Sequence, residues 1–256
     1  MNAERTDMEA VAKEPVVKEK VATVIGAGAV EALQIKRPRD VRFWILMALL
    51  VLAAASFAGI AWSVWDTAPI LKQELQVSVW LHTHGNPAFT AILFAITQVH
   101  SPVGMFVLSV LAGIWVWRHG DHYWVMSLAV AMVGGMLLNT GLKFAFHRAR
   151  PVWDDPILVL SSQSFPSGHT AGATLFYGFL AAYMVWRTKS APAHVLVVLA
   201  CALMVALVGF SRVYLGAHYI SDVLAAVSMS MVWLVLSLVG VRAYAKRRSP
   251  SSTAVA

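Results

Sequence analysis

Charged residues and cysteine are both scarce in this chain. Charged side chains make up only 13% of the 256 residues, whereas apolar residues make up 59%, and the mean hydropathy is +0.67. Because a soluble domain keeps about a quarter of its residues charged, this composition argues against a soluble fold and predicts a polytopic membrane protein. The single cysteine, Cys201, lies in an apolar run, which excludes an intramolecular disulfide and a cluster of thiolate metal ligands.

A continuous basic face is also missing, although the formal net charge is +7. The lysines and arginines occur in short patches beside apolar runs instead of along one polar surface. Membrane topology explains this distribution better than nucleic-acid binding does. We therefore expect a lipid bilayer as the partner of the chain, and no nucleic acid.

Long apolar runs predict an all-α fold, a polytopic membrane helix bundle with six transmembrane helices and one interfacial helix. The predicted spans are 43–65, about 102–117, 123–142, 168–186, 194–211 and 219–241. Residues 67–84 carry Lys72 and Glu74 beside an apolar stripe, which favours a helix lying in the membrane interface. Ser101-Pro102 is expected to break the long uncharged stretch 85–117, with 87–99 packed at shallow depth.

Three regions follow from these runs. Residues 1–42 are polar and mixed in charge and are predicted to be a disordered cytoplasmic tail. Residues 43–245 form the membrane domain, and residues 246–256 form a second cytoplasmic tail.

The distribution of basic residues predicts the orientation in the membrane. If the amino terminus is cytoplasmic, the basic segments 37–42, 118, 187–189 and 242–248 all fall inside, in agreement with the positive-inside rule. Both termini are then cytoplasmic in a plasma (inner) membrane. The opposite helix ends, which carry Lys143, His169, Arg212 and His218, are then expected together at the outer face.

The polar residues at these ends suit an anionic ligand. Arginine matches two phosphate oxygens with its planar fork, and several cations buried at one site imply an anion that binds them. Free amides at a helix start favour the same ligand. The candidate phosphate-binding residues are Lys143, Arg150, Arg212, Ser167 and Gly168, with Arg148 as a possible fourth cation.

Two histidines and an aspartate add reactive groups to the same ends. His218 and Asp222 are spaced i, i+4 at the start of the last span, which predicts that they share one helix face. A carboxylate in that position holds one imidazole nitrogen protonated and leaves the other as a nucleophile. His169 is then available as a general acid.

Together these residues resemble a known signature. Lys143-x6-Arg150-Pro151, Pro166-Ser167-Gly168-His169 and Ser211-Arg212-x5-His218-x3-Asp222 are similar to the three motifs of the type 2 phosphatidic acid phosphatase superfamily. This superfamily also contains vanadium haloperoxidases and glucose-6-phosphatases. The resemblance covers mainly residues 140–225.

The resemblance implies a role for each motif residue. His218 would attack phosphorus and form a phosphohistidine, Asp222 would orient it, and His169 would protonate the leaving oxygen and then activate water. Lys143, Arg150, Arg212, Ser167 and Gly168 would hold the phosphoryl oxygens. The chemistry implied needs no metal and no other cofactor.

Three functions are compatible with the sequence. The first is a membrane phosphatase of lipid phosphates or diphosphates with its site at the outer face. A non-enzymatic transporter or channel would predict ionisable residues at several depths, and a haloperoxidase would resemble soluble helical proteins. The motifs bind only the phosphate, so phosphatidic acid, phosphatidylglycerol phosphate and undecaprenyl diphosphate all remain open as substrates, with undecaprenyl diphosphate or a broad range favoured. The oligomeric state is open.

Overall fold

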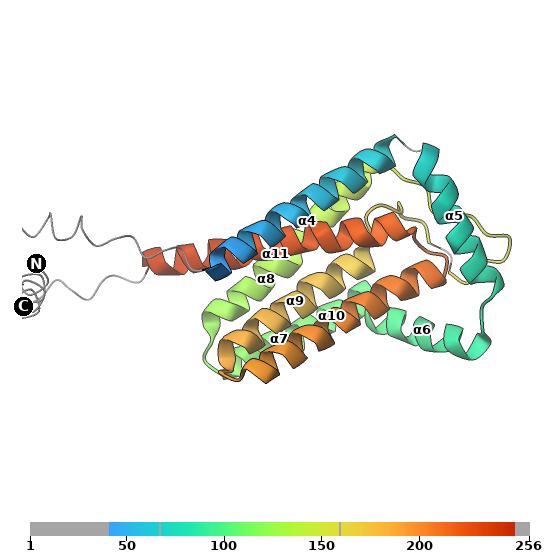
Figure 1. Ribbon diagram of the computed structural model, residues 1–256. Coiled ribbons are helices and arrows are strands. Elements are labelled where there is room, and N and C mark those ends of the chain that lie inside the picture. Colours follow the sequence, from blue (N-terminus) through green and yellow to red (C-terminus); the bar gives the residue numbers. More distant parts are fainter. Residues whose placement is uncertain (1–40, 67, 159, 249–256) are drawn as a thin grey trace, which may run out of the picture. The chain divides into compact units, whose positions relative to one another are not determined.

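The structure is a computed structural model that describes residues 41–66, 68–158 and 160–248. Within these residues the chain forms eight helices and no strand, as the composition predicts. Residues 1–48 and 49–256 are separate units, and the fold described here is that of the second unit. The helices are α4 (Val41–Trp65), α5 (Ala68–Thr83), α6 (Pro87–Val99), α7 (Pro102–Arg118), α8 (His122–Phe146), α9 (Gly168–Arg187), α10 (Ala191–Tyr214) and α11 (Ile220–Arg248) (Figure 1).

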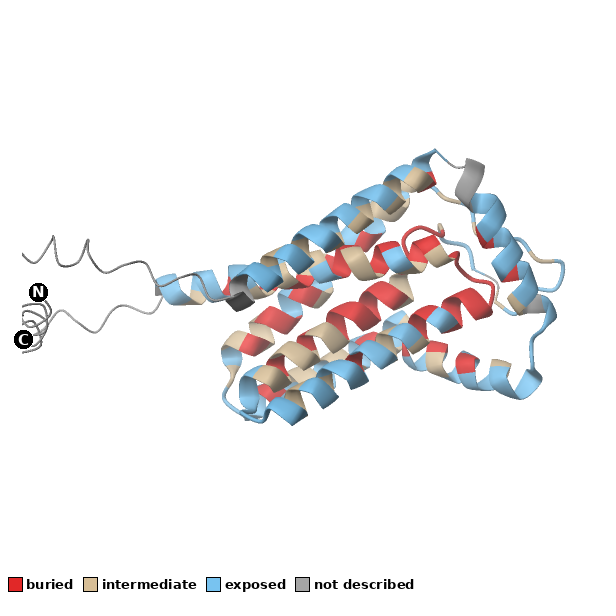
Figure 2. Cartoon of the chain, in the orientation of Figure 1, coloured by how far each residue is buried: buried red, intermediate tan, exposed pale blue. Residues whose placement is uncertain are grey.

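Helix α9 is the centre of the bundle. It packs against α7, α8, α10 and α11, and its residues from Thr170 to Phe176 are all buried. Figure 2 shows this buried stretch in red, whereas α4 is mostly exposed. The small residues Ala171, Gly172 and Ala173 let the neighbouring helices approach closely. Since α9 is enclosed by protein, it needs less lipid-compatible surface than the outer helices.

Four of the described helices, α4, α8, α10 and α11, are long and apolar enough to span a bilayer. The pair α6 and α7, bent by 57° at its break, adds a fifth if it is a single broken span. The more polar α9 does not meet the same criteria, so the predicted count of six remains a prediction.

Most predicted helices are present, with corrected ends. The break at Ser101-Pro102 is confirmed, and the Ser101 side chain caps α7 by accepting from the Gly104 amide. The predicted helix at 67–84 is α5, although its depth in a membrane is not determined. The last helix continues to Arg248, past the predicted domain boundary at 245/246, and that boundary remains a prediction.

Two predicted tails lie outside the described residues almost entirely. Of the predicted amino-terminal tail 1–42, only residues 41 and 42 are described, and they belong to α4. Of the carboxy-terminal tail 246–256, residues 249–256 are outside the described part of the chain.

The ends of four helices meet where the motifs lie. Helix α8 ends at Phe146 because His147 adopts a left-handed conformation, with φ 45°, and donates its amide to the Lys143 carbonyl. The loop 147–167 then crosses this end of the bundle to reach the start of α9. Buried Phe165 anchors that loop against Val64 and Ala225. Helix α5 lies across the same end (Figure 1).

Candidate active site

A histidine and a carboxylate form a buried pair at this end. The sequence predicted that His218 lies on the last helix. It precedes that helix instead, because α11 begins only at Ile220. It lies instead in the turn that Gly216 permits with φ +69°, and a Cβ at Gly216 would meet Trp153. The pairing itself is nevertheless present, since His218 Nδ1 lies 3.3 Å from Asp222 Oδ2 and both side chains are almost fully buried.

The contacts of His218 determine its tautomer. Arg150 Nη1 lies 3.1 Å from His218 Nε2, and a guanidinium can only donate, so Nε2 must present a lone pair. The proton is therefore on Nδ1, which donates to Asp222. Burial lowers the pKa of His218 to about 4, against the opposing effect of Asp222. The imidazole is thus neutral near pH 7, with a nucleophilic nitrogen at Nε2.

Only donors surround the Asp222 carboxylate. Oδ1 accepts from Arg148 Nη1 at 2.6 Å, and Oδ2 accepts from Ser164 Oγ at 2.5 Å and from the Tyr219 amide at 3.0 Å, besides His218. Hydrogen bonds to the charged form stabilise it. Asp222 therefore brings a fixed negative charge to the far side of the imidazole.

One cavity of about 1110 Å³ has Lys143, Arg150, Arg212, His169 and His218 in its lining. Lys143 Nζ donates to the Gln163 carbonyl at 2.5 Å, and Arg150 donates to the carbonyls of Ser162 and Ala217. Burial lowers the pKa of Arg150 from its ordinary value. The further members of this polar end are Arg212, His169, His218 and Gly168. The predicted cations Lys143, Arg150 and Arg212 are thus brought together.

The buried guanidinium of Arg212 is only partly hydrogen-bonded. Its side chain is 1% exposed, and Nη1 donates to Thr97 Oγ1 at 2.7 Å, but Nε has no partner. Buried donors are almost always satisfied, so an unpartnered N–H in a residue that lines the cavity favours an acceptor beside Arg212. A phosphoryl oxygen fits this requirement.

Two sequence predictions differ from this geometry. Arg148 does not join the phosphate pocket as a fourth cation, because its guanidinium is paired with Glu74 and Asp222. Ser167 is fully buried and does not line the cavity; its amide donates to the Asp222 carbonyl and its hydroxyl accepts from Thr170. Phosphate binding by Ser167 remains a prediction.

Among the side chains that were not predicted from sequence, three bind charged groups at this end of the bundle. Thr97 in α6 holds Arg212, Ser164 in the loop holds Asp222, and Glu74 in α5 holds Arg148. Of these, only Glu74 has a recognisable signal, because it is a charge on the face of α5 that also carries buried Ser78 and half-buried Leu81.

The described part of the chain contains no group of three or more His, Cys, Asp or Glu side chains that could hold a metal ion. Independence of metal ions remains a prediction.

Comparison with known proteins agrees with this geometry. The model of the PAP2 superfamily matches residues 124–245, which include all three motifs. Phosphatidylglycerophosphatase B of Bacillus subtilis (strain 168) is 31% identical over 147 residues, which are 57% of this chain and 72% of that protein. The chain belongs to the PAP2 superfamily. The family predicted from the three motifs is thereby confirmed.

Two solved structures share the fold. The crystal structure of the first transmembrane PAP2 type phosphatidylglycerolphosphate phosphatase from Bacillus subtilis matches with a TM-score of 0.65 and 24% identity, over 80% of this chain and 98% of that chain. Aquifex aeolicus LpxE matches with a TM-score of 0.50 and 20% identity, over 64% of this chain and 93% of that chain. At these identities the likeness establishes the helical fold and nothing finer.

Membership of the PAP2 superfamily, together with several apolar helices, makes this chain a multi-pass membrane protein and supports phosphatase activity on a lipid substrate. It favours an enzyme over the transporter or channel considered from sequence.

Proposed function

We propose that this protein hydrolyses lipid phosphates through a covalent phosphohistidine on His218. The observation that carries the proposal is the lone pair on His218 Nε2, at the same end of the cavity as three cations. In the first step Nε2 attacks phosphorus, the bond between phosphorus and the leaving oxygen breaks, and His169 gives that oxygen a proton. In the second step His169 takes a proton from water, the water oxygen attacks phosphorus, and phosphate leaves.

The surrounding charges suit both steps. Lys143, Arg150 and Arg212 would bind the phosphoryl oxygens and stabilise the negative charge that builds up on them in the transition state. Asp222 stabilises the positive charge that the imidazole acquires when Nε2 bonds to phosphorus. These residues supply the charge that a metal ion would otherwise bring, so we propose a metal-independent reaction.

The remainder of the cavity suits a hydrocarbon chain. From its polar end it extends between α7 and α8, where its lining includes Phe106, Val110, Trp117, Leu128, Met132 and Met136. The lining follows α7 from Pro102 to Trp117, roughly 22 Å at 1.5 Å per residue. A lipid could therefore enter sideways from the bilayer, with its phosphate between the cations and a tail along α7.

We propose phosphatidic acid, phosphatidylglycerol phosphate and undecaprenyl diphosphate as substrates, within a broad range. All three join an apolar chain to a phosphate, and a relative bears the name phosphatidylglycerophosphatase B. The positive-inside pattern supports an inner-membrane protein with cytoplasmic termini and an outward site. A periplasm-active reporter fused after Ala256 should give no signal, and a strong signal would overturn the orientation.

The function is tested by phosphate release from a panel of these three lipids in detergent, with and without EDTA. We expect turnover of at least one lipid, unchanged by EDTA and abolished in His218→Ala. No turnover of any lipid by the folded protein would refute the function. A loss in EDTA that Mg²⁺ restores would refute the metal-independent mechanism.

A further inference from the structure

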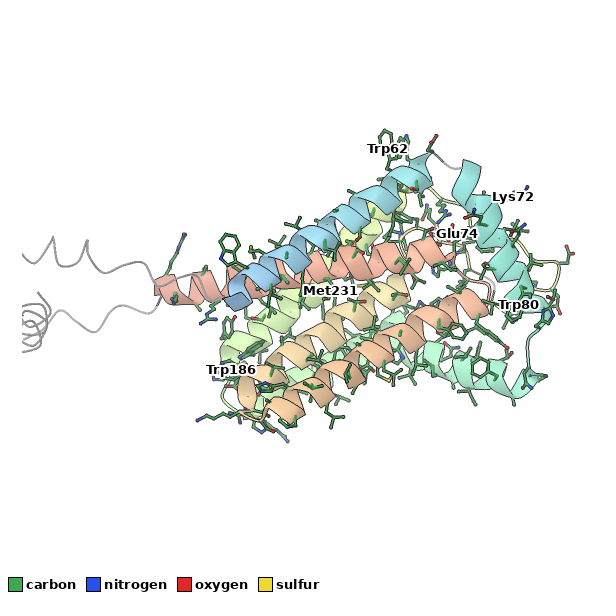
Figure 3. All side chains as sticks on the ribbon, in the orientation of Figure 1. Trp62, Lys72, Glu74, Trp80, Trp186 and Met231 are labelled. Carbon is green, nitrogen blue, oxygen red and sulfur yellow. The ribbon has the colours of Figure 1, made fainter. Side chains whose placement is uncertain are left out.

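Glu74 is a buried carboxylate outside the three motifs and outside the part of the chain that the PAP2 model matches. It lies on the side of α5 that faces α11, whereas Lys72 lies on the outward side (Figure 3). The Glu74 residue is 6% exposed, although most of its neighbours on α5 are exposed. A buried charge is costly unless it is paired and hydrogen-bonded, so its partners explain its position.

Both oxygens of Glu74 are used. Oε2 accepts from Arg148 Nη2 at 2.8 Å, and Oε1 accepts from the Ser221 amide at 2.6 Å. The second contact is to the first turn of α11, one residue before Asp222. Glu74 therefore fixes both the backbone beside Asp222 and the guanidinium that contacts it.

Arg148 connects Glu74 with the catalytic pair. Its Nη1 donates to Asp222 Oδ1 at 2.6 Å and to Ser221 Oγ at 2.7 Å, while its Cζ lies 4.4 Å from the centre of the Tyr219 ring. Asp222 Oδ2 in turn accepts the proton on His218 Nδ1. The hydrogen bonds thus run in one chain from Glu74 through Arg148 and Asp222 to the nucleophile.

The charge of Glu74 affects how strongly Asp222 acts on His218. Arg148 lies between two carboxylates, so its positive charge is shared between them. Without the negative charge of Glu74, Arg148 would be paired with Asp222 alone. Its positive charge would then offset more of the negative charge of Asp222, and a positive imidazole at His218 would be stabilised less. Low exposure of all three side chains, at 9% or less, limits screening by solvent.

We propose that Glu74 is a positioning residue for phosphoryl transfer, acting through Arg148 on the Asp222–His218 pair; this inference rests on the function proposed above. Glu74 does not line the cavity and touches no phosphate-binding residue. Its loss should therefore slow the chemical step without weakening substrate binding. Helix α5 is then part of the catalytic apparatus and not only a surface element.

The test compares Glu74→Gln with wild type, using the full chain in detergent and the best lipid phosphate of the panel. The glutamine keeps the size and can still accept from Ser221, but it removes the charge. We expect kcat to fall about 10-fold to 100-fold, as small misplacements of reacting groups do, with KM within about twofold. The rate of phosphohistidine formation in a single turnover should fall by the same factor. Glu74→Asp, which keeps the charge, should recover most of kcat.

Asp66→Asn is the matched control, because it removes an exposed carboxylate near the start of the same helix. It should leave kcat and KM unchanged. If wild type releases phosphate and Glu74→Gln matches it in kcat, or lowers only the melting temperature, this proposal is wrong and the function stands. If wild type releases no phosphate, the proposed function itself fails.

A double-mutant cycle separates action through Arg148 from an independent effect. In an Arg148→Met background, Glu74→Gln should cause no further loss of kcat, whereas losses that multiply would overturn the connection. Should Glu74→Gln not fold, Arg148→Lys tests the same link, since one ammonium cannot reproduce the fork that bridges Glu74 and Asp222. A kcat for Arg148→Lys equal to that of wild type would then refute the proposal.

Discussion

Replacing Asp222 with asparagine tests the His218 tautomer directly. Four donors converge on the carboxylate, from Arg148, Ser164, Tyr219 and His218. Asparagine offers one acceptor oxygen, one donor group and no charge. The substitution is nearly the same size, so it changes hydrogen bonding and charge while conserving volume.

Neither orientation of the asparagine amide reproduces the wild-type contacts. With its NH₂ group in place of Oδ2, it faces the Tyr219 amide and forces His218 to move its proton to Nε2, against the Arg150 donor 3.1 Å away. With its NH₂ group in place of Oδ1, it keeps the tautomer but faces Arg148 Nη1 at a site 2.6 Å away. In both cases the negative charge that would stabilise the proposed phosphorylated imidazole is lost.

The expected loss in kcat lies between two limits. A wrong tautomer in a histidine–aspartate pair costs about 10⁴-fold, a value measured for serine proteases. Loss of charge alone in a correctly oriented pair should cost less, about 10²-fold, similar to the loss of one electrostatic contact in an active site. Because Asp222 does not line the cavity, KM should change by only a fewfold.

The assay is phosphate release together with rapid-quench measurement of phosphohistidine in Asp222→Asn and in the control Asp66→Asn. Melting temperatures confirm that each variant is folded. A folded Asp222→Asn protein with kcat within about threefold of wild type would refute the argument, because the tautomer and the charge would then be irrelevant to the rate.

Three further predictions follow from the same site. His169→Ala should slow hydrolysis of a substrate with an alkoxide leaving group by about 10² to 10⁴-fold. With a nitrophenyl ester, the same variant should accumulate acid-labile phosphoprotein. Phosphoprotein that persists when His218 is also replaced by alanine would place the nucleophile elsewhere. In the proposed mechanism His218 must be neutral to attack, and burial lowers its pKa to about 4. Protonation of His218 should therefore reduce activity only as pH falls through about 4. At pH 5 about nine-tenths of the activity should remain, against about 3% for an ordinary histidine of pKa near 6.5. If kcat/KM, corrected for the ionisation of the substrate, instead falls as pH drops through about 6.5, the lowered pKa of His218 is wrong. Gly216→Ala should lower both melting temperature and kcat, because φ is +69° and the new Cβ would lie 2.5 Å from Trp153 Nε1, whereas Gly240→Ala, with no neighbour within 4 Å, should be silent in both measurements.

Local sequence patterns were sufficient to predict most of the helices and the grouping of polar residues at one end of the bundle. Uncharged runs predicted the helices, and Ser101-Pro102 predicted the break between α6 and α7, because both depend on residues close in sequence. The motif spacing predicted that Lys143, Arg150 and Arg212 meet beside His169 and His218. Successive spans cross the membrane in opposite directions, so every second helix end lies at the same face. The order of the spans therefore places these residues at one face.

Contacts between distant segments were decided only by the tertiary structure. The i, i+4 spacing suggested that His218 and Asp222 share a helix, but only Asp222 is on α11, and His218 lies in the turn that follows Gly216. Arg148 looked like a phosphate ligand, yet Glu74, 74 residues away, and Asp222 occupy its guanidinium. Sequence spacing determines which residues share a helix face, whereas the partner of a buried charge depends on which helices pack against it. For that reason the chain alone predicted which polar residues gather at this site, and it did not predict the residues that hold them in place.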